Sequence, residues 1–167
     1  TPSYAQANVD LATSESLAFS WSQPDYGFPA LASYQIQVSP TNRWTKDIQA
    51  GEKDATDQAV GDYKTFDTEF SLVKGSVAAN EMAKALQEIV RYEPNNVPAS
   101  QDVYVRVRAA YAGDTIYSNA VQIKVLPYYM KLKDAAIDVW YLIGGCIGDG
   151  AWTNDKGAVG TSVMPLY

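Results

Sequence analysis

The chain has no histidine and only one cysteine among its 167 residues. Without imidazole, neither Ser-His-Asp nor Cys-His catalysis can be assembled, and histidine-ligated zinc sites are excluded. A single cysteine cannot form an intrachain disulfide. Cys146 lies between Gly145 and Ile147 in an apolar run, which favours a small buried side chain over a reactive thiol. No cofactor is expected.

Positive charge is also scarce. There are 13 Lys and Arg against 19 Asp and Glu, and the net charge is -6. A chain of this sign is a poor partner for nucleic acid and for an anionic membrane surface. Its apolar runs are too short to cross a bilayer. The acidic residues near the C-terminus, Asp149 and Asp155 with Asn154, lack the spacing of a calcium loop, so no metal site is expected.

What the chain does contain is alternation of apolar and polar residues, the mark of half-buried strands. The clearest example covers residues 103–111, where Val103, Val105, Val107 and Ala109 face a core and Tyr104, Arg106 and Arg108 face outward. Further strands are expected at 9–11, 17–21, 33–39, 43–48, 65–72 and 117–125. Helical spacing appears once, from about 77 to 91, after a turn and candidate N-cap at Gly75-Ser76.

Antiparallel strands joined by turns, with one helix in a crossover, predict an all-β sandwich. The strands at 105–113 and 117–121 resemble the last two strands of fibronectin type III domains, and 17–21 resembles the second strand, with Trp21 as the core indole. The tyrosine that this fold buries near the start of its penultimate strand is replaced by Val103. Tyr104 lies one place further on and faces the opposite side.

A second resemblance covers most of the chain. It is carried by residues 21–34, by the helix before the Val-Arg-Val-Arg strand, and by 140–154, which reads Trp-Tyr-Leu-Ile-Gly-Gly-Cys-Ile-Gly-Asp-Gly-Ala-Trp-Thr-Asn. Together these segments resemble the SusE/SusF type, the starch-utilisation lipoproteins of the Bacteroidetes outer membrane. In that family an N-terminal fibronectin-like domain is a spacer, and carbohydrate-binding modules follow it.

The resemblance implies a division of the chain. Residues 1–12 would be a tether, 13–127 the fibronectin type III/immunoglobulin-like sandwich, and 128–167 a linker with the truncated start of a second, carbohydrate-binding-like β-sandwich. About 40 residues are too few to bury a core of their own. A β-hairpin is therefore expected there, with a turn at Asp149-Gly150 between 140–147 and 151–152 and a further strand at 161–166.

The resemblance also implies a function. The chain would be a non-catalytic surface lipoprotein segment that helps capture starch-like polysaccharide for uptake. Its partners would be polysaccharide, through downstream modules, and other outer-membrane uptake components. It would sit at the cell surface on a lipid anchor lying outside this chain. The alternative is a protein-interaction or adhesion module of the cell envelope, or an accessory domain of a carbohydrate-active enzyme.

Candidate binding residues fall in two places. Sugars stack on Trp and Tyr rings and hydrogen-bond to nearby polar groups, so Trp140, Tyr141, Trp152 and Asn154 could form a glycan site; core packing of the aromatic residues is the competing interpretation. The second place is the outward row of Tyr104, Arg106 and Arg108, which is either a solvated ladder or a contact surface. Trp44 is interpreted as a loop anchor, or alternatively as an exposed stacking residue.

Overall fold

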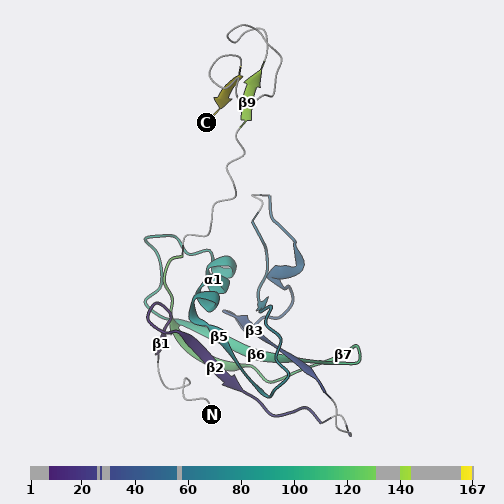
Figure 1. Ribbon diagram of the computed structural model, residues 1–167. Helices are drawn as coiled ribbons and strands as arrows, with labels where there is room; N and C mark the ends of the chain where they lie inside the picture. The colour runs from purple at the N-terminus through teal and green to yellow at the C-terminus, as the bar shows by residue number, and fades with distance from the viewer. Residues whose placement is uncertain are drawn as a thin grey trace. The chain divides into compact units, whose positions relative to one another are not determined.

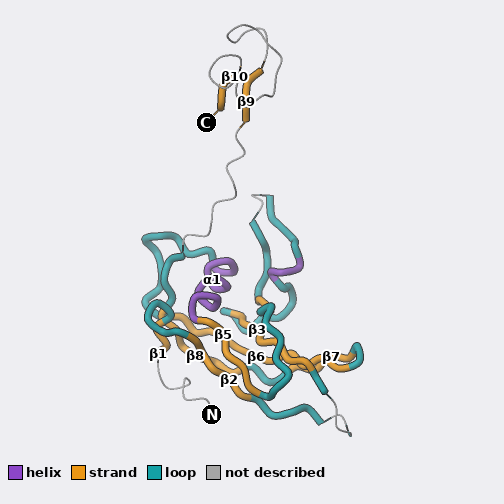
Figure 2. The backbone as a smooth tube through the Cα atoms, viewed as in Figure 1, coloured by secondary structure: helices purple, strands orange, loops and turns teal. Residues whose placement is uncertain are grey.

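The computed structural model describes residues 8–25, 27, 31–55, 58–130, 140–143 and 163–166. The chain divides into two compact units, Thr1–Met130 and Lys131–Tyr167. The first unit contains two β-sheets and one α-helix, which confirms the predicted all-β sandwich with one inserted helix (Figure 1, Figure 2).

The larger sheet has the order β1-β8-β6-β3-β4, and β7 pairs with β6. Its strands are β1 (Asn8–Asp10), β3 (Ser33–Ser39), β4 (Lys64–Thr65), β6 (Gln101–Tyr111), β7 (Asp114–Tyr117) and β8 (Val121–Leu126). The smaller sheet is the antiparallel pair of β2 (Ser16–Ser20) and β5 (Lys74–Ala78). All pairs in the larger sheet are antiparallel except β1 with β8.

The hydrophobic core lies on one face of the larger sheet. Every second residue of β3, β6 and β8 points into it, because side chains alternate across a strand. These residues are Ile36, Val38, Val103, Val105, Ile123 and Val125, and each is at most 4% exposed. Leu17 and Val77 from the smaller sheet pack against the same cluster. The alternation predicted for residues 103–109 is therefore confirmed.

Helix α1 (Ala79–Val90) packs on this core with one apolar face. The face consists of Ala79, Met82, Ala83 and Leu86, all at most 1% exposed, and follows the spacing of three and four residues that keeps side chains on one side of a helix. The helix ends at Arg91, whose backbone has the left-handed φ of 60° and whose amide donates to the Gln87 carbonyl at 2.9 Å.

The start of the helix was predicted wrongly. Gly75 and Ser76 belong to strand β5, and the N-cap is Ala78, which makes no side-chain cap bond. The reason is local packing. A Cβ on Gly75 would lie 2.6 Å from the Phe70 ring, so this glycine allows the strand to pass close under an aromatic side chain rather than forming a turn.

Two predicted strands are also wrong. Residues 43–48 form no strand, because the backbone amides of Thr45 and Lys46 donate to the Asp62 carboxylate at 3.0 Å and not to a neighbouring strand. In the predicted strand 65–72, only Thr65 belongs to β4. The amides of Phe66 and Phe70 still bond to β3 carbonyls, at 3.0 and 2.8 Å, but the chain between them leaves the sheet. Leu72 is consequently 61% exposed.

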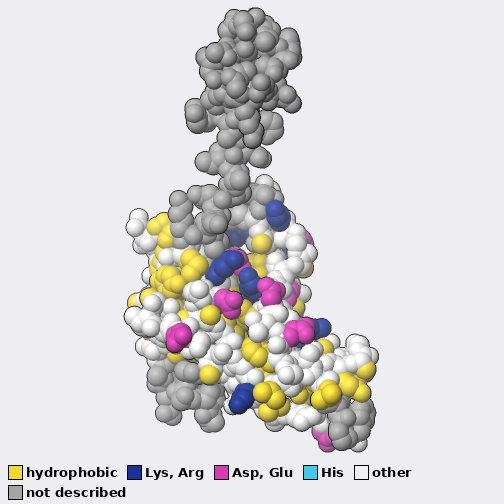
Figure 3. Space-filling model, viewed as in Figure 1, with side chains coloured by type: hydrophobic (Ala, Val, Ile, Leu, Met, Phe, Trp, Pro, Cys, Tyr) yellow, Lys and Arg dark blue, Asp and Glu magenta, His cyan; other side chains and the backbone are white. Residues whose placement is uncertain are grey.

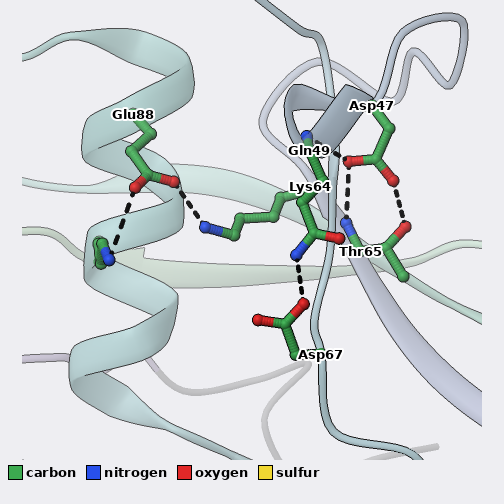
Figure 4. A network of polar contacts seen from close by, with 7 residues as sticks. Asp47, Gln49, Lys64, Thr65, Asp67 and Glu88 are labelled. Atoms are coloured by element: carbon green, nitrogen blue, oxygen red, sulfur yellow. Dashed lines mark hydrogen bonds and ion pairs between the residues drawn. The ribbon is translucent and has the colours of Figure 1, made fainter. Parts of the chain in front are cut away.

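One ion pair ties the helix to the sheet, and a second lies within the helix. Lys64 Nζ of β4 lies 2.6 Å from Glu88 Oε2 of α1, with both side chains mostly shielded (17% and 21% exposed). Lys84 Nζ lies 3.8 Å from the other oxygen of the same carboxylate but is 54% exposed. Figure 4 shows Glu88 and Lys64 facing each other across the gap between helix and strand.

The second unit is described only in part. Strand β9 (Trp140–Ile143) pairs antiparallel with β10 (Val163–Leu166). The strand predicted at 161–166 is thus present. The hairpin predicted between 140–147 and 151–152 mostly falls outside the described residues, where its turn at Asp149-Gly150 also lies, and the partner found for β9 is β10.

Candidate functional site

The outward face of β6 carries two arginines, each held by a glutamine of β3. Register places Gln37 opposite Arg106 and Gln35 opposite Arg108. Arg106 Nε donates to Gln37 Oε1 at 2.7 Å, and Arg108 Nη1 donates to Gln35 Oε1 at 2.7 Å. Tyr104 lies on the same face, half-buried, opposite Ser39. The three predicted residues therefore share one face, and two of them form a cross-strand polar ladder.

Three aromatic rings surround the first of these arginines. The Cζ atom of Arg106 lies over the Trp44 ring and over the Tyr117 ring, 4.1 Å from each centroid, and 5.7 Å from the centroid of Tyr63. At these distances a guanidinium is attracted by the negative face of an aromatic ring. We call Trp44, Tyr63, Arg106 and Tyr117 the arginine–aromatic cluster.

The loop before β4 positions two of these rings. The Trp44 indole Nε1 donates to Asn42 Oδ1 at 3.0 Å, and the Trp44 and Tyr63 rings lie 5.7 Å apart at 55°. Trp44 is bonded and stacked in this loop, as the loop-anchoring interpretation expects, and its half-buried ring still exposes part of its surface to solvent. Asp62 anchors the loop between them by accepting the bonds from Thr45 and Lys46 described above.

Those bonds affect the Asp62 carboxyl. Burial alone would raise its pKa, but the hydrogen bonds from the Thr45 side chain and from the two backbone amides outweigh burial and lower the pKa below the ordinary value of 3.8. A charged Asp62 thus stabilises the loop that supports Trp44.

A polar relay lies behind the cluster. Gln37 Nε2 donates to Thr65 Oγ1 at 2.8 Å, and Thr65 Oγ1 donates to the Asp47 carboxylate. Figure 4 shows Asp47 facing Thr65, with Gln49 turned toward Asp67. Gln37 is only 2% exposed and is itself held by Thr65. The orientation of the Arg106 guanidinium is therefore set by a buried, fixed group of the fold.

The arginines are not neutralised by carboxylates. The ion pairs in the described part of the chain involve Lys46, Lys64, Lys84, Arg91 and Lys124. Arg106 and Arg108 instead have neutral glutamine acceptors. Burial lowers the pKa of Arg106, while Tyr117 and Tyr63 act in the opposite direction; arginine nevertheless keeps its charge in proteins.

A groove of 330 Å³ opens between β2 and the β6–β8 side of the sandwich, and Tyr117 of the arginine–aromatic cluster is one of its lining residues. The residues described as lining it include aromatic and aliphatic side chains with a few hydroxyls and one amide, and none is charged. Trp21 lies at its wall, half-buried and packed against Tyr34 and Phe70 at ring distances of 5.4 and 6.1 Å. This indole, expected in the core, thus lies at its margin, and its buried Nε1 has no hydrogen-bond acceptor among the described residues.

The predicted glycan residues of the second unit are placed only in part. Trp140 and Tyr141 lie in β9, opposite Leu166 and Pro165 of β10. Trp152 and Asn154 lie outside the described residues, so the glycan site there stays a prediction. Among the residues that the structure describes, no group of three or more acidic or cysteine side chains is arranged to hold a metal ion.

The sequence identifies the arginines, and it names Trp44 as a loop anchor or stacking residue, but it does not identify Tyr63 or Tyr117 as their neighbours. Tyr117 was expected in a strand running on to Val125, whereas β7 ends at Tyr117 and β8 begins only at Val121. Tyr63 and Trp44 lie on a loop whose path no periodic pattern reveals. The available signal is weak: Tyr117 lies in a strand that pairs with β6, whereas Trp44 and Tyr63 lie on the loop before β4.

The two sheets and the inserted helix define an all-β sandwich domain whose outward face presents ordered arginine and aromatic side chains. The profile of the SusE outer membrane protein family matches residues 1–108, which extends from the N-terminus into β6. The chain belongs to this family of outer-membrane proteins. No solved structure gives a significant match to the chain. In the described part of the chain, the helices are too short or too polar to cross a bilayer.

Proposed function

We propose that the protein is a non-catalytic cell-surface component of a system that captures and takes up polysaccharide. The observation that carries this proposal is membership of the SusE outer membrane family over residues 1–108. In this proposal the sandwich is a spacer anchored to the outer membrane by a lipid, and it presents carbohydrate-binding modules to glycan in the medium. Holding several modules together raises the effective concentration of glycan at the surface.

The core supports a spacer role. Buried residues of both sheets and α1 form one continuous cluster, and the Lys64–Glu88 pair fixes the helix to the sheet. A domain packed in this way resists bending, because close-packed interiors transmit strain rather than absorb it. A stiff domain keeps its two ends at a constant separation, which is what a spacer requires.

The groove supports a non-catalytic role. Glycoside hydrolysis usually needs two carboxylates on either side of the scissile bond. The residues described as lining the 330 Å³ groove include no Asp or Glu. The described lining of this groove therefore offers no acid pair.

Affinity electrophoresis tests the function. The full-length natural protein that contains this chain is run through gels holding starch, other neutral glucans or acidic polysaccharides, together with a non-binding protein of similar charge. Retardation by at least one polysaccharide, without release of reducing sugar, is the expected result. Unchanged migration in every gel, or the release of sugar ends, would contradict the proposal.

A further inference from the structure

The arginine–aromatic cluster combines an uncompensated charge with aromatic surface. The chain carries a net charge of -6, yet the two arginines on the outward face of β6 have neutral partners, Gln37 and Gln35. In an acidic protein, unpaired carboxylates are available to neutralise surface arginines, so a pair held away from them requires a separate explanation. Such a pair attracts an anion.

The donors of Arg106 are partly free. Gln37 Oε1 accepts the hydrogen bond from Nε, and within the described residues no acceptor bonds to the two terminal nitrogens. The planar guanidinium presents these nitrogens as a fork that matches a carboxylate in two parallel hydrogen bonds. Its orientation is already fixed by Gln37 and by the rings of Trp44 and Tyr117. A ligand would therefore bind without first ordering a long flexible side chain.

The rings next to the fork offer apolar surface. Tyr117 is 48% exposed, and Trp44 and Tyr63 are half-buried. Figure 3 shows hydrophobic side chains gathered at the end of the molecule where β7 lies, whereas basic and acidic groups are intermixed over α1. Aromatic rings of this kind stack on the apolar faces of pyranose sugars. The site thus places a carboxylate receptor next to a sugar-stacking surface.

We propose that the arginine–aromatic cluster binds a uronic acid residue of an acidic polysaccharide. The Arg106 fork receives the sugar carboxylate, the aromatic rings contact the pyranose ring, and Arg108 attracts a further charge along the chain. This inference rests on the proposed function and names its substrate class. A neutral glucan has no carboxylate to pair with Arg106. A flexible acidic peptide has no sugar ring to stack on the aromatic side chains.

The test is calorimetric titration of the 167-residue chain with trigalacturonate, with maltotriose and with capped triglutamate as comparison ligands. Trigalacturonate is expected to bind, and to bind more weakly when the ionic strength is raised from about 0.01 M to about 0.15 M, because salt screens exposed charges. Maltotriose is expected not to bind. Triglutamate binding as tightly as trigalacturonate would overturn the proposal in favour of an acidic protein partner.

Variants locate the site. Arg106→Lys keeps the charge but removes the fork, and it is expected to weaken trigalacturonate by about ten-fold; Arg106→Gln is expected to abolish detectable binding. Lys124→Gln is the matched control, because this lysine lies on the same sheet, is 50% exposed and already pairs with Asp102. Equal loss in the control, or unchanged affinity in Arg106→Lys, would overturn the proposal. Far-ultraviolet circular dichroism checks that each variant is folded.

The full-length natural protein separates this inference from the proposed function. If it is retarded by a neutral glucan while the chain fails to bind trigalacturonate, the uronate site is wrong and the capture function stands. If no polysaccharide of either charge retards it, the capture function itself is wrong.

Discussion

Neighbouring residues of strand β6 point to opposite faces of the sheet and meet different surroundings. Inward, Val103, Val105 and Val107 are at most 8% exposed; the first two pack into the main core, and Val107 packs into a second buried cluster. Outward, Arg106 and Arg108 contact glutamine and aromatic side chains. One strand of alternating type thus supplies core residues on one side and the arginines of the proposed binding site on the other, because successive side chains point to opposite sides of a sheet.

The largest expected effect on stability lies on the inward, core-facing side of the larger sheet, at Ile123 of β8. Ile123→Ala removes buried methyl groups from a residue that is 1% exposed, and we expect the free energy of unfolding to fall by about 2–5 kcal/mol, since the lost transfer energy adds to a cavity term. Urea denaturation followed by circular dichroism measures the change.

Gln122→Ala is its matched control, because Gln122 is the exposed neighbour on the same strand. Its expected change is within about 0.5 kcal/mol. Similar losses in the two variants would show that the faces do not differ in the way described.

A smaller effect is expected at the helix clamp. Lys64→Met removes a shielded ion pair and leaves Glu88 with the weaker Lys84 contact alone, so we expect a loss of about 1–2 kcal/mol. Lys84→Met removes an exposed contact, and we expect a change of less than about 0.5 kcal/mol. Thermal unfolding of both variants gives the ranking; a larger loss for Lys84→Met would refute the importance of shielding.

We expect the free energy of unfolding at alkaline pH to depend on the buried Tyr92. Burial raises the pKa of Tyr92 to about 12 from an ordinary value of 10.0, and its hydroxyl donates to Gln101. Because the pKa of Tyr92 is higher in the folded protein than in the unfolded chain, the folded state is fully stabilised below pH 10. This stabilisation is lost as the pH rises toward 12. Tyr92→Phe should thus be less stable by about 1 kcal/mol at neutral pH, and the difference should shrink between these pH values.

The measurement is the unfolding free energy of wild type and Tyr92→Phe at several alkaline pH values. Only the difference between the two proteins is interpreted, because other tyrosines and lysines titrate in both. A difference that stays constant up to pH 12 would mean that Tyr92 ionises equally easily in the folded and unfolded states.

A modest effect on stability is expected in the arginine–aromatic cluster. Trp44→Ala removes a ring that Arg106 contacts at 4.1 Å, and a partly exposed cation–π contact contributes about 0.5–1 kcal/mol. Chemical denaturation should show a loss of about 1 kcal/mol, with the melting of the sandwich still cooperative. A loss as large as that of Ile123→Ala would make the cluster part of the structural core.

The sequence predicted the two faces of β6 correctly because alternation is a local property. Ser33–Ser39 was predicted with its observed bounds. The loop from 43 to 63 could not be predicted, since its path depends on Asp62 capping two amides and on contacts with residues far along the chain. The strand expected at 43–48 failed for the same reason: the Asp62 carboxylate, and not a neighbouring strand, accepts the amides of Thr45 and Lys46.

In the candidate site, too, some features could be predicted from the sequence and others could not. Arg106 and Arg108 were identified from strand alternation, and Tyr104 lies with them on the outward face. The contact between Trp44 and Arg106 joins residues more than sixty positions apart by their numbers, and no periodic pattern carries such information. The groove was missed because Trp21 reads as a core residue by pattern, although it ends at the margin of the sandwich.

The most direct test measures two quantities, unfolding free energy and affinity for trigalacturonate, in two variants at adjacent positions of β6. We predict that Val105→Ala lowers stability by about 1–3 kcal/mol and leaves affinity unchanged, whereas Arg106→Lys weakens affinity by about ten-fold and barely alters stability. If both quantities change together in both variants, the two faces of the strand are not separable and the account is wrong.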